Sequence, residues 1–414
     1  MKKVGNIIIF CLFMLLNLNA ELDSATVVIQ RDRAYLRQGP GAYYTVLSEV
    51  PVKTKLTVKD KDDGWLKVTY NKLTGYISKT STVAQPASKD IFAQMGTTST
   101  NVTISRHGMS AGVKGFGERF TKAFKGNTDF LTAAETYHLD PKEFQKFKKD
   151  TYKKVDLDKI RKANRLAVRK IPDYFSEAQE GFGLGVAAAV ANLGLYQNPV
   201  MQEYVNSIGQ LVVEASDVTD VSFKFFILDI PAPNAYACPG GYIFITKGML
   251  QYIQSEAELA CILGHEIAHV SCFHGLKEMR NRQNQIAADE AFGELDEELP
   301  DAYDEETKLT EQELEDEAFS MYETIIQGRL DAYEEEADVM GLKFAIRAGF
   351  NPAALLNVVQ RMVNNGVSSN NEHFRPSILT KRIGWINREL AAQKIRSGLL
   401  GNASRWNKYA ATLN

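Results

Sequence analysis

Residues 265–269 combine two histidines and a glutamate at the spacing of a metal-binding helix. The segment reads His265-Glu266-Ile267-Ala268-His269. Four residues advance an α-helix by about 400°, so the two imidazoles project within about 40° of each other and can share one ion. Zinc suits such a pair, and Glu266 is placed beside the ion to take a proton from a water molecule there. The pattern predicts one zinc ion per chain, bound by His265 and His269, with Glu266 as catalytic base.

A third ligand is needed, because two histidines on a helix also arise without any metal. The metzincin pattern is excluded, since the seventh and tenth positions after His265 are Cys272 and Gly275 instead of glycine and histidine. His274 lies about 180° around the same helix from His265, so we expect it to pack or to form a hydrogen bond. An acidic third ligand remains.

The acidic segment Glu334–Asp338 supplies candidates for it. On a helix expected over residues 330–349, Glu334 and Asp338 share one face at i and i+4. Glu334 would complete the zinc site, and Asp338 would accept the ring N–H of a ligand histidine. Glu335 and Glu336 should face solvent. The alternative is an acidic helix that faces solvent and binds no metal.

The helix that carries the two histidines has a signal at each end. Ser255 followed by Glu258 fits a capping box, and Gly275 is a residue at which a helix commonly ends. We therefore expect a helix over residues 255–275.

Length and composition limit the kind of protein that surrounds these helices. The chain has 414 residues, of which 44% are hydrophobic and 24% charged, so two or three globular domains are expected and a disordered chain is excluded. The formal charge of −3 provides no basic excess for general nucleic-acid binding.

Residues 1–20 have the features of a secretory signal peptide. Lys2 and Lys3 precede an apolar run that ends in Leu18-Asn19-Ala20. Export to the periplasm or cell envelope is expected, with an uncleaved membrane anchor as the alternative. The apolar segment 183–195 is too short to cross a bilayer and is expected to form a packed helix, so membrane association should be peripheral at most. Cleavage would leave three cysteines, for which buried free thiols are expected: Cys238, Cys261 and Cys272.

Residues 24–83 alternate between polar and apolar side chains as short strands of a small barrel do. Their turns at residues 37–41, 62–65 and 74–77 resemble those of the bacterial SH3 domain. The resemblance implies binding of a cell-wall peptide through four aromatic residues: Tyr43, Tyr44, Trp65 and Tyr76. Alternatively, these rings form the core of the barrel.

Three segments differ in composition from the rest of the chain. Residues 84–103, rich in Thr, Ser, Ala and Gln, are expected to be a linker, followed by a basic helical region over residues 104–170. Residues 289–317 hold fifteen acids and one lysine, and form an insertion in a domain spanning residues 171–398. This insertion is expected to be a solvated loop or, as the alternative, an acidic flap that covers the site.

Three motifs in order resemble the gluzincin family of HtpX, the CAAX prenyl protease and BepA. They are the segment 263–270 around the histidines, Glu334-x-x-Ala337-Asp338, and the upstream segment 234–243. The resemblance covers about residues 170–390 and is nearest to the soluble BepA branch, because no internal membrane span is evident. It implies a multi-domain protein, with a small all-β SH3-like barrel followed by a mainly α-helical α+β zincin domain.

The resemblance also assigns further site residues. Glu334 matches the third zinc ligand of the family. The substrate cleft would be bordered by Asn234, Ala235, Tyr236, Gly240, Gly241 and Tyr242. The strand over residues 242–246 would offer its edge to an extended substrate. A tight turn at Pro239-Gly240-Gly241 is compatible with this role.

One motif departs from the family. Where the family often has Thr-His-Pro, this chain has Phe374-Arg375-Pro376, with His373 just before and Arg382-Ile383 after. Arg375 and His373 are therefore candidate stabilisers of the transition state, while the alternative is a surface ion pair of Arg375.

The expected function is that of an exported zinc metalloendopeptidase. Its substrates would be unfolded or misassembled envelope proteins or peptides, which is protein quality control. One alternative is a cell-wall peptide hydrolase that binds murein through residues 24–83. Another is a non-catalytic assembly factor or chaperone, against which the intact Glu266 argues, because a binding protein needs no general base.

Overall fold

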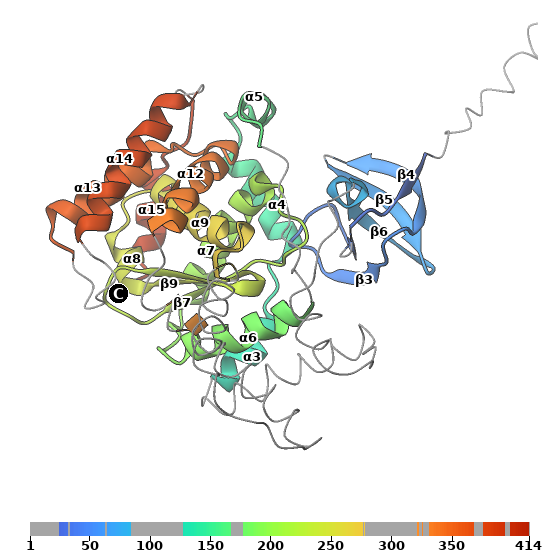
Figure 1. Cartoon of the computed structure of the whole chain (residues 1–414), viewed down its shortest axis with the longest axis horizontal. Helices are drawn as coiled ribbons and strands as arrows, with labels where there is room; N and C mark the ends of the chain where they lie inside the picture. The colour runs from blue at the N-terminus through green and yellow to red at the C-terminus, as the bar shows by residue number, and fades with distance from the viewer. Residues whose placement is uncertain are drawn as a thin grey trace, which may run out of the picture. The chain divides into compact units, whose positions relative to one another are not determined.

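A computed structural model describes most of the chain (Figure 1). The described residues are 25–31, 34–62, 64–83, 127–166, 177–275, 277, 321–322, 325, 331–367, 376–393 and 398–413. They divide into two compact units, with the boundary between Gln85 and Pro86. The expected signal peptide 1–20, linker 84–103 and acidic insertion 289–317 lie outside the described residues, as do His373 and Arg375.

The first unit is an all-β barrel of antiparallel strands in the order β1-β4-β5-β6-β2-β3. Its elements are β1 (Thr26–Val28), β2 (Ala34–Arg37), β3 (Val46–Val50), β4 (Lys55–Asp62), β5 (Trp65–Tyr70), β6 (Leu73–Ser78) and the 3-10 turn η1 (Lys79–Thr82). The polar and apolar alternation of the sequence matches the observed faces, since Leu56, Val58, Leu66 and Val68 are all buried. The predicted small barrel is confirmed.

The core of this barrel is aliphatic. It contains Ile29, Ala34, Leu36, Val50, Leu56, Val58, Leu66, Val68 and Ile77. Tyr43, Tyr44, Trp65 and Tyr76 are half-buried and lie outside this core. The alternative that they form the barrel core is therefore wrong, because branched aliphatic residues already fill it.

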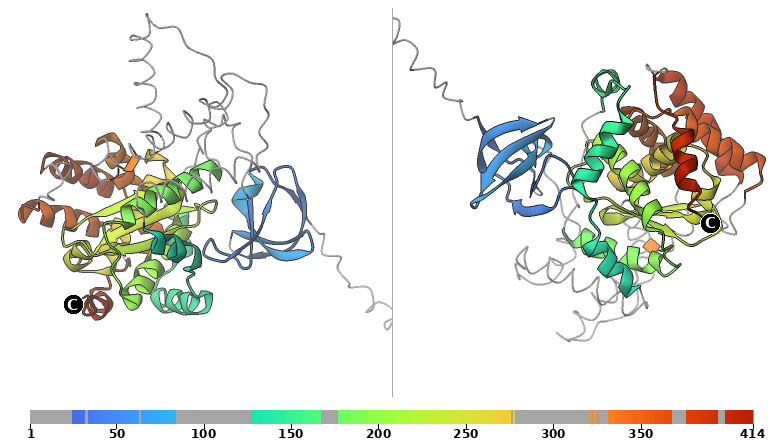
Figure 2. Two further views of the ribbon diagram at one scale, coloured as in Figure 1. Left: turned by 90° about the horizontal axis from the view of Figure 1, so that it is seen from below. Right: turned by 180° about the vertical axis from the view of Figure 1, so that it is seen from behind.

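The second unit is mainly helical and contains one short sheet (Figure 2). Its first helices are α3 (Thr128–Thr136), α4 (Pro141–Thr151), α5 (Leu157–Ala163), α6 (Glu177–Ala191) and α7 (Pro199–Ser216). The sheet region has β7 (Lys224–Leu228), β8 (Ala235–Cys238), the 3-10 turn η2 (Pro239–Gly241), β9 (Tyr242–Thr246) and α8 (Lys247–Tyr252). The remaining helices are α9 (Glu256–Ser271), α12 (Asp331–Arg347), α13 (Ala353–Asn364), α14 (Pro376–Ala392) and α15 (Ala403–Ala410). The α+β class is as predicted.

The sheet has the order β7-β9-β8, with β7 parallel and β8 antiparallel to β9. The expectation that residues 242–246 offer a strand edge is wrong, because β9 is the central strand and pairs on both sides. The glycines of η2 make the tight connection between β8 and β9, and both Gly240 and Gly241 have positive φ angles of 79° and 92°. Glycine adopts this conformation without steric cost.

Helices cover both faces of the sheet, with α7 and α9 on one side and α3 and α6 on the other (Figures 1 and 2). Phe130 of α3 contacts Phe226 and Phe244 of the sheet at ring distances of 4.9 and 5.5 Å. Five residues of α6 are buried in the same cluster, which confirms the predicted packed helix: Val186, Ala187, Ala188, Val190 and Ala191. This cluster covers one face of the sheet, and α9 packs against β8 on the other face.

Helix α9 begins as predicted but ends earlier. The Ser255 hydroxyl accepts a hydrogen bond from the Glu258 N–H at 3.2 Å, and the Glu258 carboxylate in turn accepts from the Gln254 N–H at 2.8 Å. The helix ends at Ser271 instead of near Gly275, because Phe273 has a left-handed φ of 59°. The chain therefore turns sharply just before His274.

Helices α9 and α12 meet backbone to backbone at two glycines. A Cβ atom on Gly264 would lie 2.8 Å from the Gly341 carbonyl oxygen, and one on Gly341 would lie 2.6 Å from the His265 nitrogen. Real Cβ atoms do not approach so closely, so only glycine fits at either position. This contact brings the histidines of α9 next to the acidic residues of α12.

The C-terminal segment contains a docked helix, α15. Trp406 of α15 is buried and donates its indole N–H to the Ile253 carbonyl at 2.8 Å. Asn402 and Arg405 bind the buried Glu256 carboxylate at the start of α9. The Trp406 ring also lies 6.1 Å from the Tyr204 ring of α7, so α15 packs on α7 as well as on the start of α9.

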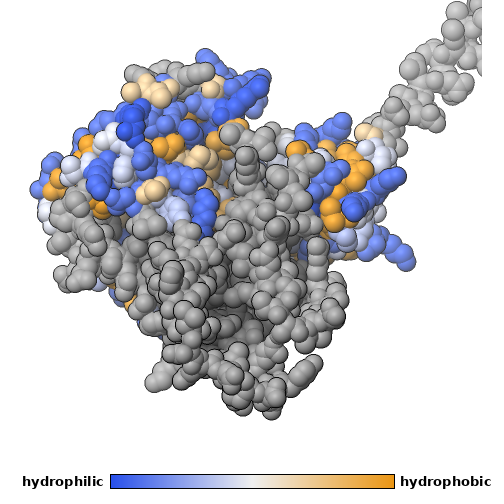
Figure 3. Space-filling model, in the orientation of Figure 1, coloured by the Kyte–Doolittle hydropathy of each residue, from blue (hydrophilic) through white to orange (hydrophobic). Residues whose placement is uncertain are grey.

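The described surface mixes polar and apolar residues on the face shown in Figure 3. No helix among the described residues has both the length and the apolar character that a membrane span requires. The three described cysteines are thiols, as expected. Cys238 and Cys261 are also buried, as expected, whereas Cys272 is half-buried.

Candidate metal centre

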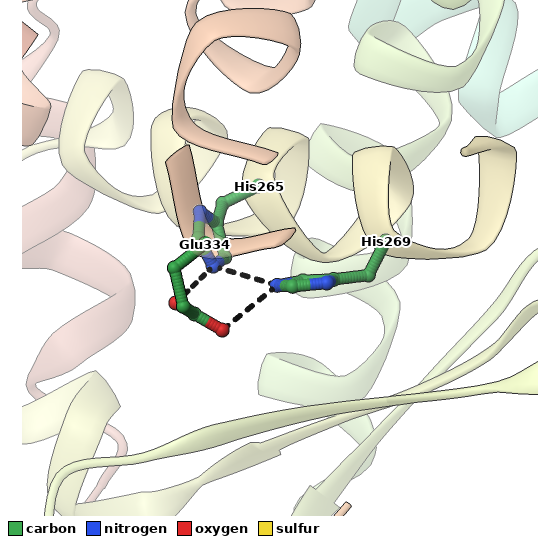
Figure 4. A group of neighbouring side chains, drawn as sticks. All are labelled: His265, His269 and Glu334. Atoms are coloured by element: carbon green, nitrogen blue, oxygen red, sulfur yellow. Dashed lines mark hydrogen bonds and ion pairs between the residues drawn. The ribbon is translucent and has the colours of Figure 1, made fainter. Parts of the chain in front are cut away.

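Three side chains from two helices converge on one point (Figure 4). The Nε2 atoms of His265 and His269 on α9 lie 3.0 Å apart. Each faces one carboxylate oxygen of Glu334 on α12, at 3.4 Å in both cases. The two histidines are 5% and 3% exposed. The structure thus brings together the three residues that the sequence predicts as metal ligands.

Asp338 contacts His265 through the ring nitrogen that does not face Glu334. Its Oδ1 lies 2.8 Å from the His265 Nδ1. A carboxylate accepts, so the Nδ1 carries the hydrogen, and in the neutral ring the Nε2 then presents a lone pair. This is the contact expected for Asp338 from the i, i+4 spacing.

Two residues of α14 complete this support, and the sequence prediction assigned neither a role. Arg382 donates to both oxygens of Asp338 at 3.0 and 2.8 Å, and Trp385 donates its indole N–H at 2.6 Å. Arg382 also lies 3.9 Å from Glu334. Their spacing of three residues places both on one helix face, which is the signal that could have indicated them.

At this site, the partners of each ionisable group shift its pKa against the direction that burial alone would give. Burial and Arg382 lower the pKa of His265, but Asp338 and Glu334 outweigh them and raise it to about 9. Burial raises the pKa of Glu334, yet the hydrogen bonds from His265 and His269 hold it well below its usual value. Burial likewise raises the pKa of Asp338, but Arg382 and His265 outweigh burial and lower it below its usual value. Both carboxyl groups are therefore ionised at neutral pH.

The donor set fits a divalent metal of borderline softness. Two imidazole nitrogens and one carboxylate lie on separate residues, and their ligand atoms lie within 4.8 Å of one another. Without a metal ion, a proton on the Nε2 of one ring joins the two imidazoles and Glu334, in agreement with the raised pKa of His265. A cation between them uses both lone pairs and the Glu334 charge. His₂Glu is a donor set found in catalytic zinc sites.

His269 is also contacted through the ring nitrogen that does not face Glu334. Its Nδ1 lies 2.9 Å from the Nδ1 of His274, whose Nε2 lies 3.0 Å from a Glu336 oxygen. His274 shows both of the roles expected for it, since it is buried and stacked on Tyr333 and also forms these hydrogen bonds. Glu336 is exposed, as expected, and its carboxylate also contacts His274, because the turn at Phe273 brings His274 back beside α12.

Glu266 is 7% exposed and follows His265 on the same helix. Its charge raises the pKa values of Tyr236 on β8 and of Arg382 on α14, although burial is the largest influence on both groups. Burial raises the pKa of Tyr236 and would lower that of Arg382, where Asp338 prevails. The carboxylate of Glu266 is thus near enough to both groups to act on their pKa values.

The expected cleft residues occupy the β8–β9 hairpin. Asn234 precedes β8 and joins it to β9, since the Asn234 N–H donates to the Thr246 hydroxyl at 2.9 Å. Ala235 and Tyr236 lie on β8, which packs against α9. Gly240, Gly241 and Tyr242 form the far end of the hairpin, where Tyr242 packs on Phe130.

Comparisons with known proteins agree with the motifs. Residues 199–390 match peptidase family M48, and residues 32–83 match the bacterial SH3 domain. The predicted resemblance to this peptidase family, with an SH3-like domain, is therefore confirmed.

Several curated proteins resemble this chain. The beta-barrel assembly-enhancing protease of Yersinia pestis is 28% identical over 177 residues, which are 42% of this chain and 35% of the relative. The protein of that name from Escherichia coli (strain K12) is 26% identical over 175 residues, 41% of this chain and 34% of the relative. Mitochondrial metalloendopeptidase OMA1 of Schizosaccharomyces pombe is 30% identical over 76 residues, 18% of this chain and 23% of the relative. The chain thus spans about a third of these relatives, or less.

Proposed function

We propose that this chain, whose residues 199–390 carry a domain of peptidase family M48, is a zinc-dependent metalloendopeptidase. The observation that carries the proposal is the convergence of His265, His269 and Glu334, with Glu266 on the same helix as the two histidines. His265, His269 and Glu334 would hold the ion. Bound zinc supplies Lewis-acid activation of water and of a carbonyl group.

The residues of the chain divide the remaining work. Glu266 accepts the proton of the attacking water and returns it to the nitrogen of the leaving amine, so that the peptide bond is hydrolysed with no net change in Glu266. Asp338 keeps the Nδ1 hydrogen on His265 and the Nε2 lone pair toward the ion. Arg382 and Trp385 hold Asp338 in place and ionised.

The proposed substrates are unfolded or misassembled proteins of the cell envelope. The names of the bacterial relatives, beta-barrel assembly-enhancing protease, support this class. A polypeptide would lie beside β8, because this strand packs against α9. The strand also carries Tyr236, whose pKa is raised by the charge of Glu266 in addition to the larger effect of burial. The proposed location is the periplasm or envelope, reached through the signal sequence at residues 1–20.

The test is cleavage of casein, an unfolded protein, by the mature chain with and without a metal chelator, beside a metal assay and Glu266→Gln. We expect one zinc per chain and cleavage that is lost with chelator and in the variant. The variant should retain zinc, because Glu266 is not a ligand. Chelator-resistant cleavage, or wild-type protein without metal, would refute the proposal.

A second role is proposed for the barrel, as a binding module for cell-wall peptide. The rings of Tyr43 and Tyr44 lie 4.5 Å apart and half-buried outside the core, where they can meet a ligand. Sedimentation with purified murein should be lost in Tyr43→Ala/Tyr44→Ala. Release of murein peptides by the wild-type chain, with casein left intact, would favour the cell-wall hydrolase instead.

A further inference from the structure

The connection after α9 brings a third histidine back to the candidate metal centre. Phe273 adopts the left-handed conformation, which is unfavourable for a bulky residue without glycine's freedom. The result is that His274, although beyond the helix end, lies fully buried against His269. Unfavourable backbone conformations that persist in a fold are often maintained for a function.

The hydrogen positions along this contact follow from the metal-binding geometry. If the Nε2 of His269 binds the ion, its Nδ1 carries the hydrogen and must donate. The Nδ1 of His274, 2.9 Å away, then accepts, which leaves the His274 hydrogen on Nε2. That atom lies 3.0 Å from the Glu336 carboxylate, which can only accept when ionised.

We propose that His274 and Glu336 are positioning residues that hold His269 in the orientation and tautomer needed to bind the metal. This inference rests on the proposed function. The pair does for His269 what Asp338 does for His265, with one imidazole placed between ligand and carboxylate. Tyr333 fixes the plane of the His274 ring, since the two rings stack at 4.7 Å and 16°.

The same residues could instead bind a second ion, because Cys272, His274 and Glu336 each offer an atom within 4.8 Å of the others. Two contacts favour the positioning role. The Nε2 of His274 is already used by Glu336, and the Lys277 ammonium lies 3.6 Å from the same carboxylate oxygen, where it would repel a cation.

Two substitutions of His274 separate positioning from packing. His274→Phe keeps a ring to stack on Tyr333 but removes the acceptor for the His269 N–H. His274→Asn loses the ring, yet its amide oxygen stands near the place of Nδ1 and can accept. If His274 only fills space, zinc affinity should fall less in His274→Phe than in His274→Asn. If His274 positions His269, zinc affinity should fall less in His274→Asn.

The measurements are made on the full mature chain with zinc alone, through competition with a chelator. Positioning contacts of this kind are worth about 10–100-fold in metal affinity, so we expect that loss in His274→Phe and a smaller one in His274→Asn. Thermal unfolding without metal should rank the variants in the opposite order. The visible absorption of Co²⁺-substituted protein should change in His274→Phe, because the orientation of one ligand is no longer fixed.

Two neighbouring glutamates give a matched pair. Glu336→Ala should weaken zinc binding, whereas Glu335→Ala should not, since Glu335 is similarly exposed but pairs with Arg388. Unchanged zinc affinity and an unchanged Co²⁺ spectrum in His274→Phe would overturn the positioning role and leave the proposed function intact. A wild-type chain that bound no zinc would overturn both. Loss of a second zinc ion in Glu336→Ala would show that these residues are ligands and would also overturn the proposal.

Discussion

The two ends of α9 both bury charged residues, but they use them differently. At the N-terminal end, the Glu256 carboxylate accepts hydrogen bonds from Tyr204 at 2.5 Å and from Asn402 and Arg405 at 2.6 Å. All of these donors belong to elements that pack around the helix start. At the C-terminal half, the Nε2 atoms of His265 and His269 point toward each other and toward Glu334.

The comparison shows that burial of charge alone does not mark a functional site. Glu256 is fully buried, yet the groups around it are all donors that satisfy one acceptor. The histidines have their Nδ1 atoms engaged from behind, while their Nε2 atoms converge on a shared point. Two imidazoles and a carboxylate that can each direct a lone pair to one point form the donor set of a metal ion, and that arrangement indicates the candidate ligand site.

The largest expected effect tests the functional half of this comparison. Glu266→Gln removes the proton acceptor without changing the shape of the side chain. Casein turnover should fall about 10²–10⁴-fold, the usual contribution of a general base. Zinc content and melting temperature should stay at wild-type levels. A variant with normal turnover would show that another group takes the proton.

The next effect tests the structural end. Glu256→Gln places an amide nitrogen among donors and leaves the Arg405 guanidinium without its carboxylate. Breaking a buried ion pair in this way costs about 3 kcal/mol of unfolding free energy, to be measured by denaturant unfolding. Zinc affinity of the folded variant should be unchanged. A parallel loss of zinc affinity would mean that the two ends of α9 are coupled.

An equivalent change at the metal centre should have a smaller effect of another kind. Asp338→Asn leaves an amide N–H₂ facing His265, Arg382 or Trp385, all of which donate to this carboxylate. We expect zinc affinity to fall about 10–100-fold in chelator competition. Glu335→Gln, on the exposed face of the same helix, serves as the control. Equal zinc affinity in the two variants would contradict the role assigned to Asp338.

The smallest effect again concerns the helix start. Arg361 donates to both oxygens of Glu258, at 3.2 and 2.6 Å, and to the Tyr252 carbonyl. Arg361→Lys keeps the charge but cannot form this fork, so unfolding free energy should fall by about 1 kcal/mol. Casein turnover should not change. A drop in turnover larger than the drop in stability would place Arg361 in the active half.

The local parts of this architecture could be predicted from the sequence. Helical spacing brings His265 beside His269 and Glu334 beside Asp338 because it depends only on residues a few positions apart. The alternation in β4 and β5 likewise follows from a period of two. The capping box at Ser255 is another local signal, and the structure contains it.

Other features depend on distant segments and escaped prediction. The central position of β9 follows from its parallel pairing with β7. These two strands are not consecutive, because β8 lies between them in the sequence. The return of His274 depends on one left-handed residue, Phe273, which no side-chain preference indicates. Arg382, on α14, reaches Asp338 only because the helices pack together. The position of α15 is likewise fixed by a distant contact, the bond of Arg405 to Glu256 of α9.

The contact between Gly264 and Gly341 has a consequence for how this site can change over evolutionary time. Because backbone meets backbone there, the distance between the ligand-bearing helices does not depend on the volumes of neighbouring core residues. Those residues can drift without altering the spacing of the donors. A single methyl group at either glycine, by contrast, would move Glu334 away from both histidines at once, which is a one-step route to a descendant that keeps its fold and loses the three-residue site.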